Sequence, residues 1–284
     1  MPEGPEIRRA GDRISKVLVG KEIIESNFYY EHVQDKAEIV KNKNIKEITT
    51  RGKAMLIRFD NGWTMYSHNQ LYGRWTVNLN TTKIKSKRAL RVVFKTTTHT
   101  VRLWSATDID LIPTFEETEH TFLKKIGPDV LDESCSFELI KERIISKNFY
   151  KKKASTLMLD QTVFAGLGNY LRSEILFDAK IHPDDRPFDL DEVRINQWAK
   201  SIKIITYLAY KTGGFTVSKS IAEINKANGE RKKSYRHAVF MRYKYECINC
   251  KSRIERKWYG KRKLDYCPSC QIKRGKIKML QNNY

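Results

Sequence analysis

The sequence predicts an α+β protein of several domains: a helix and an antiparallel β-sandwich or barrel, then a helical region, then a C-terminal zinc finger. Three observations predict this order. Short segments rich in β-branched and aromatic residues fill residues 22–111, and apolar residues recur at helical spacing over 136–211. Two Cys-x2-Cys pairs stand near the C-terminus.

The first third of the chain begins with a predicted helix over 5–17, where Ile7, Ala10 and Ile14 are spaced to share one helix face. Six predicted strands follow, bounded by turns such as Asp60-Asn61-Gly62. These strands are 45–50, 54–59, 63–68, 74–79, 89–94 and 100–105. Repeated short strands of this kind are typical of an antiparallel sandwich or barrel.

The middle of the chain begins with a predicted linker, 112–133, and continues with helical patterns at 136–146, 155–165, 170–178 and 190–211. Gly166 and Gly168 break the second helix from the third, and we expect Asn169 to N-cap the third. Free amides at that helix start favour an anion such as phosphate. An ordinary corner between two helices is the alternative. A basic loop, 214–236, follows.

Four cysteines near the C-terminus predict one structural zinc ion. Cys247 and Cys250 form one pair, Cys267 and Cys270 form the other, and sixteen residues separate the pairs. Disulfides are the alternative, which a reducing compartment disfavours. Residues 253–266 alternate like a hairpin with Gly260 near its tip, which places Lys261, Arg262 and Lys263 on an exposed turn. The fifth cysteine, Cys135, is expected to be a small buried hydrophobe.

The charge indicates a nucleic-acid partner. The chain carries 54 Lys and Arg against 33 Asp and Glu, a net charge of +21, and residues 226–284 hold 18 of these basic residues but only 4 acidic ones. A uniform compositional bias would not concentrate charge in this way, whereas a nucleic-acid-binding module would. Neither a secretory signal nor an apolar membrane span is recognisable, so we expect a soluble cytoplasmic protein.

Three short stretches suggest chemistry, and each has a simpler explanation. Pro2 and Glu3 follow Met1, although Met-Pro is also a common start. Lys53 begins a predicted strand, where a lysine is usually a solvated charge. The loop of Gln70, Leu71 and Tyr72 either tucks into the core or forms a wedge that fills the space of an extruded base.

These stretches together resemble one protein family. MPEGPEI, RGKA, SHNQLYG, IGPDVLD, LDQTVFAGLGNYLRSEIL and the closing C-x2-C-x16-C-x2-C are similar, in this order, to the formamidopyrimidine-DNA glycosylase/endonuclease VIII family. Gly4 and the QLYG loop resemble its endonuclease VIII branch. The resemblance implies an N-terminal β-sandwich with flanking helices (1–118), a helix–two-turn–helix domain (119–236) and a zinc finger with a basic tail (237–284).

The resemblance also implies a bifunctional DNA glycosylase and abasic-site lyase of base-excision repair, which removes mainly oxidised pyrimidines and nicks the strand by β,δ-elimination. Removal of Met1 would leave Pro2 as a terminal secondary amine that attacks a sugar C1′ and forms a Schiff base. An α-amino group has a pKa about two units below that of lysine, so a useful fraction is unprotonated at neutral pH. Glu3 is similar to the family's general acid. Glu6 and Glu3 would supply negative charge to the iminium.

The remaining site residues follow from the same resemblance. Lys53 is similar to the proton donor of β-elimination, and Arg262 to the finger arginine that grips phosphate and serves δ-elimination. Gln70, Leu71, Tyr72, Lys125 and Asn169 match DNA-contacting positions. Relatives often carry arginine at position 125, so lysine keeps the charge but loses bidentate geometry. The approach to the first cysteine, YKYEC, also departs from the Gly-containing turn of relatives.

The expected partner is damaged double-stranded DNA, bound by a monomer, with the tail 271–284 expected to be a disordered, polyanion-binding segment. A non-catalytic zinc-finger DNA-binding protein of the same fold is the main alternative. A basic RNA-binding or ribosome-associated protein is another, which explains the charge and the zinc but neither the terminus nor the QLYG loop.

Overall fold

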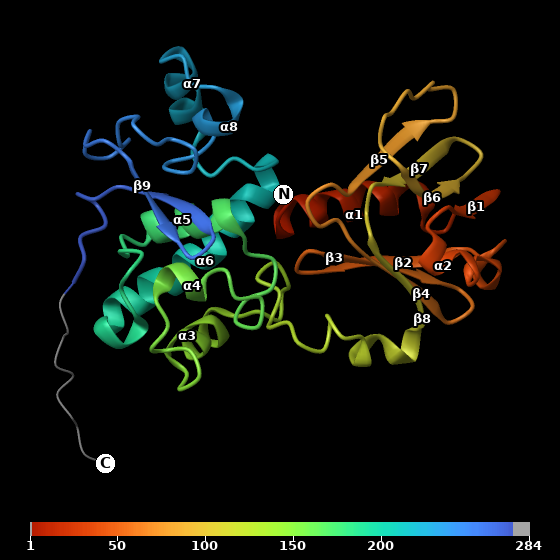
Figure 1. The fold of residues 1–284 in the computed structure, drawn as a ribbon, viewed down its shortest axis with the longest axis horizontal. Coiled ribbons are helices and arrows are strands. Elements are labelled where there is room, and N and C mark those ends of the chain that lie inside the picture. Colours follow the sequence, from red (N-terminus) through yellow and green to blue (C-terminus); the bar gives the residue numbers. More distant parts are fainter. Residues whose placement is uncertain (1, 275–284) are drawn as a thin grey trace. The chain divides into compact units, whose positions relative to one another are not determined.

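The computed structural model describes residues 2–274, and the chain divides into two compact units, Met1–Ile126 and Gly127–Tyr284 (Figure 1). We describe each unit by itself. No described helix is both long and apolar enough to cross a membrane. The three-domain division at 118/119 and 236/237 stays a prediction.

The first unit is a sandwich of two four-stranded antiparallel sheets, as the sequence predicted. One sheet has the order β2 (Ile45–Arg51), β3 (Ala54–Phe59), β4 (Trp63–His68) and β8 (Asp108–Pro113). The other has the order β1 (Glu25–Phe28), β6 (Leu90–Lys95), β7 (His99–Trp104) and β5 (Arg74–Leu79). Short helical segments complete the unit, namely α2 (Glu31–Gln34), η1 (Ala37–Val40) and η2 (Thr114–Glu119).

Helix α1 (Gly4–Leu18) packs against the sandwich through the face that the apolar spacing predicted. Ile7, Ile14 and Leu18 are buried in one core with side chains from both sheets, such as Ile57 and Phe94. This packing fixes the start of α1 relative to the sheets because the buried side chains interdigitate. The outer face of the β2–β3–β4–β8 sheet is covered as well, by residues that include Leu123.

Two strands, β1 and β8, were not predicted from the sequence. β1 has the sequence ESNF, which has weak β-propensity, and it exists because its backbone pairs with β6. β8 extends to Pro113, inside the region predicted to be a linker. It completes its sheet by pairing with β4. In both cases a neighbouring strand, rather than local sequence, decides the structure.

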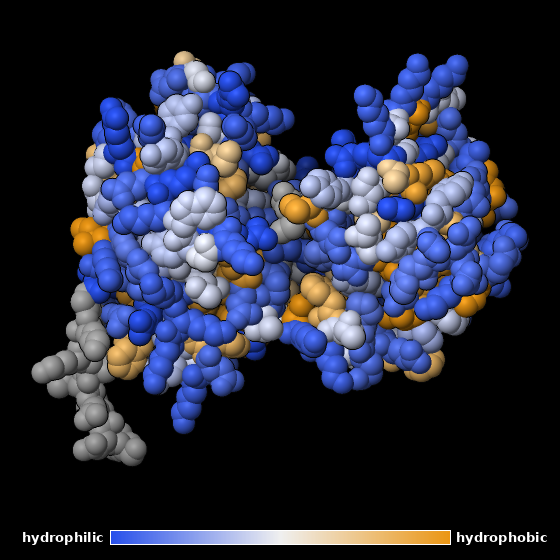
Figure 2. Space-filling model, viewed as in Figure 1, coloured by the Kyte–Doolittle hydropathy of each residue, from blue (hydrophilic) through white to orange (hydrophobic). Residues whose placement is uncertain are grey.

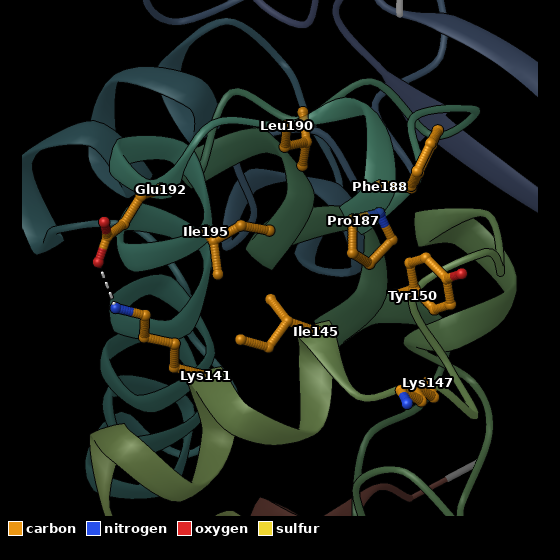
Figure 3. A pocket seen from close by; sticks show the side chains of 9 residues that line it. All are labelled: Lys141, Ile145, Lys147, Tyr150, Pro187, Phe188, Leu190, Glu192 and Ile195. Carbon is orange, nitrogen blue, oxygen red and sulfur yellow. Dashed lines mark hydrogen bonds and ion pairs between the residues drawn. The ribbon is translucent and has the colours of Figure 1, made fainter. Parts of the chain in front are cut away.

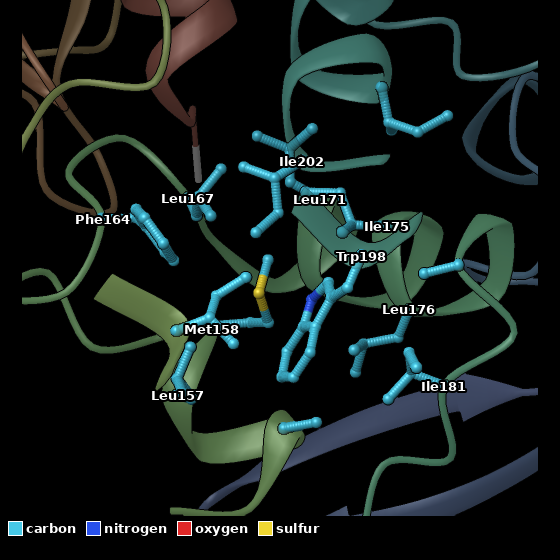
Figure 4. Packing of buried hydrophobic residues seen from close by; sticks show 14 of the residues in the cluster. Leu157, Met158, Phe164, Leu167, Leu171, Ile175, Leu176, Ile181, Trp198 and Ile202 are labelled. Carbon is cyan, nitrogen blue, oxygen red and sulfur yellow. The ribbon is translucent and has the colours of Figure 1, made fainter. Parts of the chain in front are cut away.

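The second unit contains the helical region and the hairpin of the predicted finger. Its elements are α3 (Phe137–Ile145), α4 (Ala154–Leu157), α5 (Asn169–Asp178), η3 (Pro187–Asp189), α6 (Glu192–Thr212), α7 (Lys219–Ala227), α8 (Lys232–Tyr235), β9 (Glu255–Tyr259) and β10 (Arg262–Tyr266). Trp198 lies fully buried at the centre of its core among residues such as Met158 and Leu176 (Figure 4). Leu264 and Tyr266 of β10 join the same core, so the hairpin is packed onto the helices. Cys135 is buried, as expected.

The predicted helix 155–165 is wrong beyond α4. The Asp160 carboxylate accepts hydrogen bonds from the backbone N–H (2.9 Å) and hydroxyl (2.6 Å) of Thr162, and these compete with helical bonds. A Cβ on Gly127 would lie 2.5 Å from the Val163 carbonyl oxygen, so this glycine permits a close backbone approach that replaces the helix. The predicted loop 214–236 is also wrong, since it contains α7 and α8.

Two smaller predictions are corrected. Gly168, not Asn169, is the N-cap of α5, and Asn169 is its first helical residue. The basic tail was predicted to be disordered from residue 271, but Gln271 is buried and donates to the Ile181 carbonyl at 2.9 Å. Residues 275–284 of that tail lie outside the described residues.

Candidate active site and metal centre

Two buried charges distinguish the first unit. Among the charged side chains of residues 2–126, only Glu3 (3% exposed) and Lys53 (7% exposed) are buried. Burying a charge is costly, so ionisable groups in such positions are candidates for chemistry. The simpler explanation of Lys53, an ordinary solvated lysine, is therefore wrong.

Glu3 and its neighbours lie where α1 begins. Glu3 is the N-cap residue of α1, with Pro2 directly before it and partly exposed. The Glu3 backbone N–H donates to the Glu6 carboxylate at 2.9 Å, which orients Glu6 toward the start of the helix. Pro5 in the first turn favours a helix start here because its fixed φ suits the helix and its missing N–H is not needed.

Lys53 lies in the tight turn that joins β2 to β3. Gly52 makes this turn possible with a φ of +61°. His68 stands opposite the next residue, Ala54, at the end of β4. Burial lowers the pKa of His68, Asp108 raises it, and the positive charge of Lys53 lowers it further. Sequence reasoning missed His68, although it belongs to the SHNQLYG stretch.

The QLYG loop follows β4 and projects outward. Leu71 is 64% exposed and Tyr72 is 71% exposed, so the alternative of a loop tucked into the core is wrong. The loop closes tightly: the Gly73 N–H donates to the Asn69 carbonyl at 2.7 Å. A Cβ on Gly73 would lie 2.4 Å from that same oxygen, so the loop requires glycine here.

Hydrogen bonds anchor the base of this loop. Thr107 Oγ1 donates to Gln70 Oε1 at 2.7 Å, and the Gln70 backbone N–H donates to His68 Nδ1 at 3.2 Å. Gln70 adopts a φ of +49°, an uncommon value for a residue other than glycine. The base of the loop is thus held while its apolar tip is left exposed.

In the second unit, Asn169 and Arg172 of α5 both bind the carbonyl oxygen of Lys263. Asn169 Nδ2 donates at 3.0 Å and the Arg172 guanidinium donates at 3.1 Å. Arg172, which the sequence analysis did not select, also donates to Asn169 Oδ1 at 2.6 Å and is fully buried. The start of α5 therefore fixes the hairpin strand that begins with the exposed Arg262.

A buried hydrogen-bond chain supports the segment that leads to the finger. Glu174 Oε1 and Oε2 accept from the backbone N–H groups of residues 238–240 at 2.7–2.8 Å. Arg236 Nε donates to His237 Nε2 at 3.0 Å, so His237 Nδ1 carries the proton and donates to Thr216 Oγ1 at 2.9 Å. Thr216 in turn donates to Glu174 at 2.5 Å. Burial raises the pKa of Glu174 and lowers that of His237.

The four cysteines form a cluster that could hold a metal ion. The Sγ atoms of Cys247, Cys250, Cys267 and Cys270 all lie within 4.8 Å of one another. The Cys247–Cys270 and Cys250–Cys267 sulfur separations are 3.8 and 3.4 Å, far longer than a disulfide bond. Bonds of about 2.3 Å to a tetrahedral zinc ion would place its sulfur ligands roughly 3.8 Å apart. The donor set and its spacing therefore suit zinc.

A cavity in the second unit is not part of the predicted site. A cavity of about 660 Å³ opens among α3, η3 and α6 of the second unit, with Ile145, Tyr150 and Phe188 in its wall and a Lys141–Glu192 ion pair at one side (Figure 3). None of the predicted site residues lines it. Lys125 is exposed. Hydrophilic residues cover most of the face that Figure 2 shows, as a net charge of +21 would suggest.

Comparison with known proteins decides the family. The model of the formamidopyrimidine-DNA glycosylase N-terminal domain matches residues 1–108, and that of the formamidopyrimidine-DNA glycosylase H2TH domain matches residues 126–220. The chain belongs to the formamidopyrimidine-DNA glycosylase family. It is 37% identical to Endonuclease 8 of Escherichia coli and 39% identical to that of Salmonella arizonae, over 95% of this chain and 100% of each relative.

Solved structures agree with this assignment. The Lactococcus lactis formamidopyrimidine-DNA glycosylase bound non-covalently to abasic-site DNA is 25% identical with a TM-score of 0.77, covering 95% of this chain and all of that one. The same enzyme with DNA containing an oxidised pyrimidine is 25% identical with a TM-score of 0.78, covering 96% of this chain and all of that one.

Family membership settles the class of activity. The protein is a bifunctional DNA glycosylase and abasic-site lyase of base-excision repair. The predicted resemblance, including the endonuclease VIII branch, is confirmed, and so is the predicted fold with its cysteine cluster. The non-catalytic alternative finds no support.

Proposed function

We propose that the protein, as a monomer, binds damaged double-stranded DNA, excises mainly oxidised pyrimidines and nicks the strand by β,δ-elimination. One observation carries the proposal: Glu3 and Lys53 are the only buried charged side chains among residues 2–126, and Pro2 directly precedes Glu3. A buried acid beside a secondary amine, with a buried cation in the same unit, is a suitable set of groups for Schiff-base chemistry.

Pro2 acts as the nucleophile once Met1 is removed. The amine lies at the start of α1, where the partial positive charge of the helix favours its unprotonated form. Its nitrogen attacks the sugar C1′, and the bond from C1′ to the damaged base breaks. The product is a cationic iminium, which the carboxylates of Glu3 and Glu6 stabilise.

Glu3 and Lys53 move protons. Glu3, which is buried beside Pro2, protonates the sugar ring oxygen as the ring opens. The iminium then withdraws electrons, so that the C2′ proton is lost and the bond from C3′ to its phosphate breaks. Lys53 assists this β-elimination, and Arg262 serves the δ-elimination that breaks the bond at C5′.

The remaining residues hold the DNA. The exposed Leu71 and Tyr72 enter the base stack, and Gln70 contacts the base left unpaired. Arg262 and Lys125 bind phosphate. Asn169 acts mainly by positioning the hairpin and less by contacting DNA, since its amide nitrogen already donates to the Lys263 carbonyl.

One structural zinc ion bound by Cys247, Cys250, Cys267 and Cys270 supplies no reaction step; it fixes the turns that carry the finger. The sulfur spacing supports this assignment. Hydrogen bonds from α5 to the β10 strand also hold the finger hairpin in place.

Borohydride trapping tests the proposal. The mature protein mixed with abasic-site duplex and borohydride should form a covalent adduct, because reduction fixes the iminium. Pro2→Gly or a short uncleaved extension before Pro2 should suppress the adduct. Full trapping with a blocked terminus would instead identify an internal amine, with Lys53 the first candidate.

A further inference from the structure

Trp258 is an exposed tryptophan that the proposed function does not use. It is 64% exposed, whereas Trp75, Trp104 and Trp198 are at most 8% exposed. Trp63 is half-buried. Exposing an indole to water forgoes the large gain from its burial, and tryptophan is enriched at interfaces, where one end of the ring system is apolar and the other is wet.

The hairpin register places Trp258 on the outer side of the finger. Trp258 pairs with Lys263, while its neighbour Tyr259 pairs with Arg262. Successive strand residues point to opposite faces, and the face that includes Tyr259 packs on the helical core. We call Trp258 and Lys263 the outer hairpin face. Arg262 lies on the other face, so the two faces can contact different ligands.

The outer hairpin face is also basic. The Lys263 ammonium lies over the Trp258 ring, 4.9 Å from its centroid. The hairpin residues 256–263 include five Lys or Arg. Arg256 is neutralised by Asp265 at 2.5 Å, but within residues 2–274 no carboxylate lies within 4.0 Å of the Lys261 or Lys263 ammonium. An aromatic ring beside unneutralised cations is complementary to a base and its phosphate.

We propose that the outer hairpin face binds single-stranded nucleic acid, with one unpaired base stacked on Trp258 and the neighbouring phosphates on Lys261 and Lys263. The bases of an intact duplex are already stacked on one another, so they cannot offer a face to the indole. This site goes beyond the proposed function, because it requires neither a lesion nor Pro2 chemistry.

Binding should be measured with the full-length protein and an undamaged labelled oligonucleotide of about ten nucleotides. The single strand should quench tryptophan emission, since the other tryptophans are at least half-buried. Trp258→Ala should weaken single-strand affinity roughly 5- to 150-fold, the usual range for one stacked base. Trp258→Phe should retain most of the affinity, because it keeps a stacking ring.

Tyr207→Ala is the matched control. Tyr207 is likewise exposed (54%) and has a lysine ammonium 5.2 Å from its ring centroid, but it lies on α6. This variant should bind the single strand normally. Borohydride trapping on abasic duplex should be unchanged in Trp258→Ala, so that failure of this proposal is distinguishable from failure of the proposed function.

Two results with the variants would overturn the proposal: unchanged single-strand affinity in Trp258→Ala, or equal losses in the phenylalanine and alanine variants. Quenching by anionic lipid vesicles but not by the oligonucleotide would also overturn it, and would make the face a membrane contact.

Discussion

Two glutamates one helical turn apart differ in their surroundings. Glu3 is buried, whereas Glu6 is half-buried and accepts the Glu3 backbone N–H. Only the buried carboxyl is placed as a general acid in our proposal, so the two should respond differently to the same substitution.

Glu3→Gln should lower base excision on the order of 10²–10⁴-fold, the usual span for general acid catalysis. Cleavage of a preformed abasic site should persist in part, because that substrate has no base to release. Single-turnover assays on both substrates measure the split. Glu6→Gln is the control and should lose far less excision. Equal loss of both activities in Glu3→Gln would make Glu3 a structural residue.

His237 should make the folded state sensitive to acid. Burial, with a smaller contribution from Arg236, lowers its pKa from 6.5 to about 3, so the native state holds a neutral imidazole. The unfolded chain takes up a proton below about pH 6.5. The contribution of the neutral His237 to the free energy of unfolding is therefore complete above pH 6.5. It is lost as the pH falls toward 3, by at most about 1.4 kcal/mol per pH unit.

Urea unfolding between pH 7 and pH 4.5 checks this prediction. His237→Gln should flatten the pH dependence of the unfolding free energy, while the exposed His32→Gln should leave it as in the parent protein. An unaltered slope in His237→Gln would assign the acid sensitivity to other groups.

At the scale of elements, the QLYG loop depends on one close backbone contact. Gly73→Ala would place a Cβ 2.4 Å from the Asn69 oxygen, so the loop must open. We expect a loss of stability of about 1–3 kcal/mol and weaker excision with abasic-site cleavage less affected. Thermal unfolding and single-turnover excision measure both. Gly62→Ala, at a φ of +80° with no atom within 4 Å of the added Cβ, is the control and should spare excision.

The finger hairpin depends on the cysteine cluster at one end and on α5 at the other. Cys250→Ser or chelation should release the metal and lower DNA binding and δ-elimination together, since the turns that carry Arg262 lose their fixed geometry. Metal analysis should find one zinc per chain in the parent protein. A metal-free preparation with full activity would contradict this prediction.

At the scale of the whole molecule, the charge makes DNA binding strong but unselective. The net charge of +21 attracts any duplex, and counterion release contributes equally whatever the lesion. Selectivity must come from how readily a damaged base leaves the stack and from the residues that replace it.

We therefore expect thymine glycol and dihydrouracil to be excised faster than 8-oxoguanine opposite cytosine. Thymine glycol has lost ring planarity and stacks poorly, which lowers the cost of extrusion. 8-Oxoguanine stacks and pairs well, and no residue described above is dedicated to it. Single-turnover rates on matched duplexes decide the matter. A preference for 8-oxoguanine opposite cytosine would refute the lesion assignment and leave the Pro2 chemistry untouched.

Local sequence was sufficient to predict those elements in which local forces dominate. The apolar spacing of α1, the turn at Asp60-Asn61-Gly62 and the Cys-x2-Cys spacing are all confirmed. Local sequence was insufficient where a residue distant in the chain determines the backbone conformation. β1 and β8 form by pairing with other strands, and residues 158–165 leave the helix because Asp160 and Gly127 offer other bonds.

The class of fold, the family and the residue types at the site follow from the sequence, because motif spacing and periodicity are properties of the chain. Tertiary structure alone decided which of these residues are buried or exposed. It buried Glu3 and Lys53, exposed Leu71 and Tyr72, and joined Asn169 and Arg172 to a carbonyl more than ninety residues away. Burial and long-range hydrogen bonds depend on what packs against a residue, and that neighbour is fixed only when the whole chain has folded.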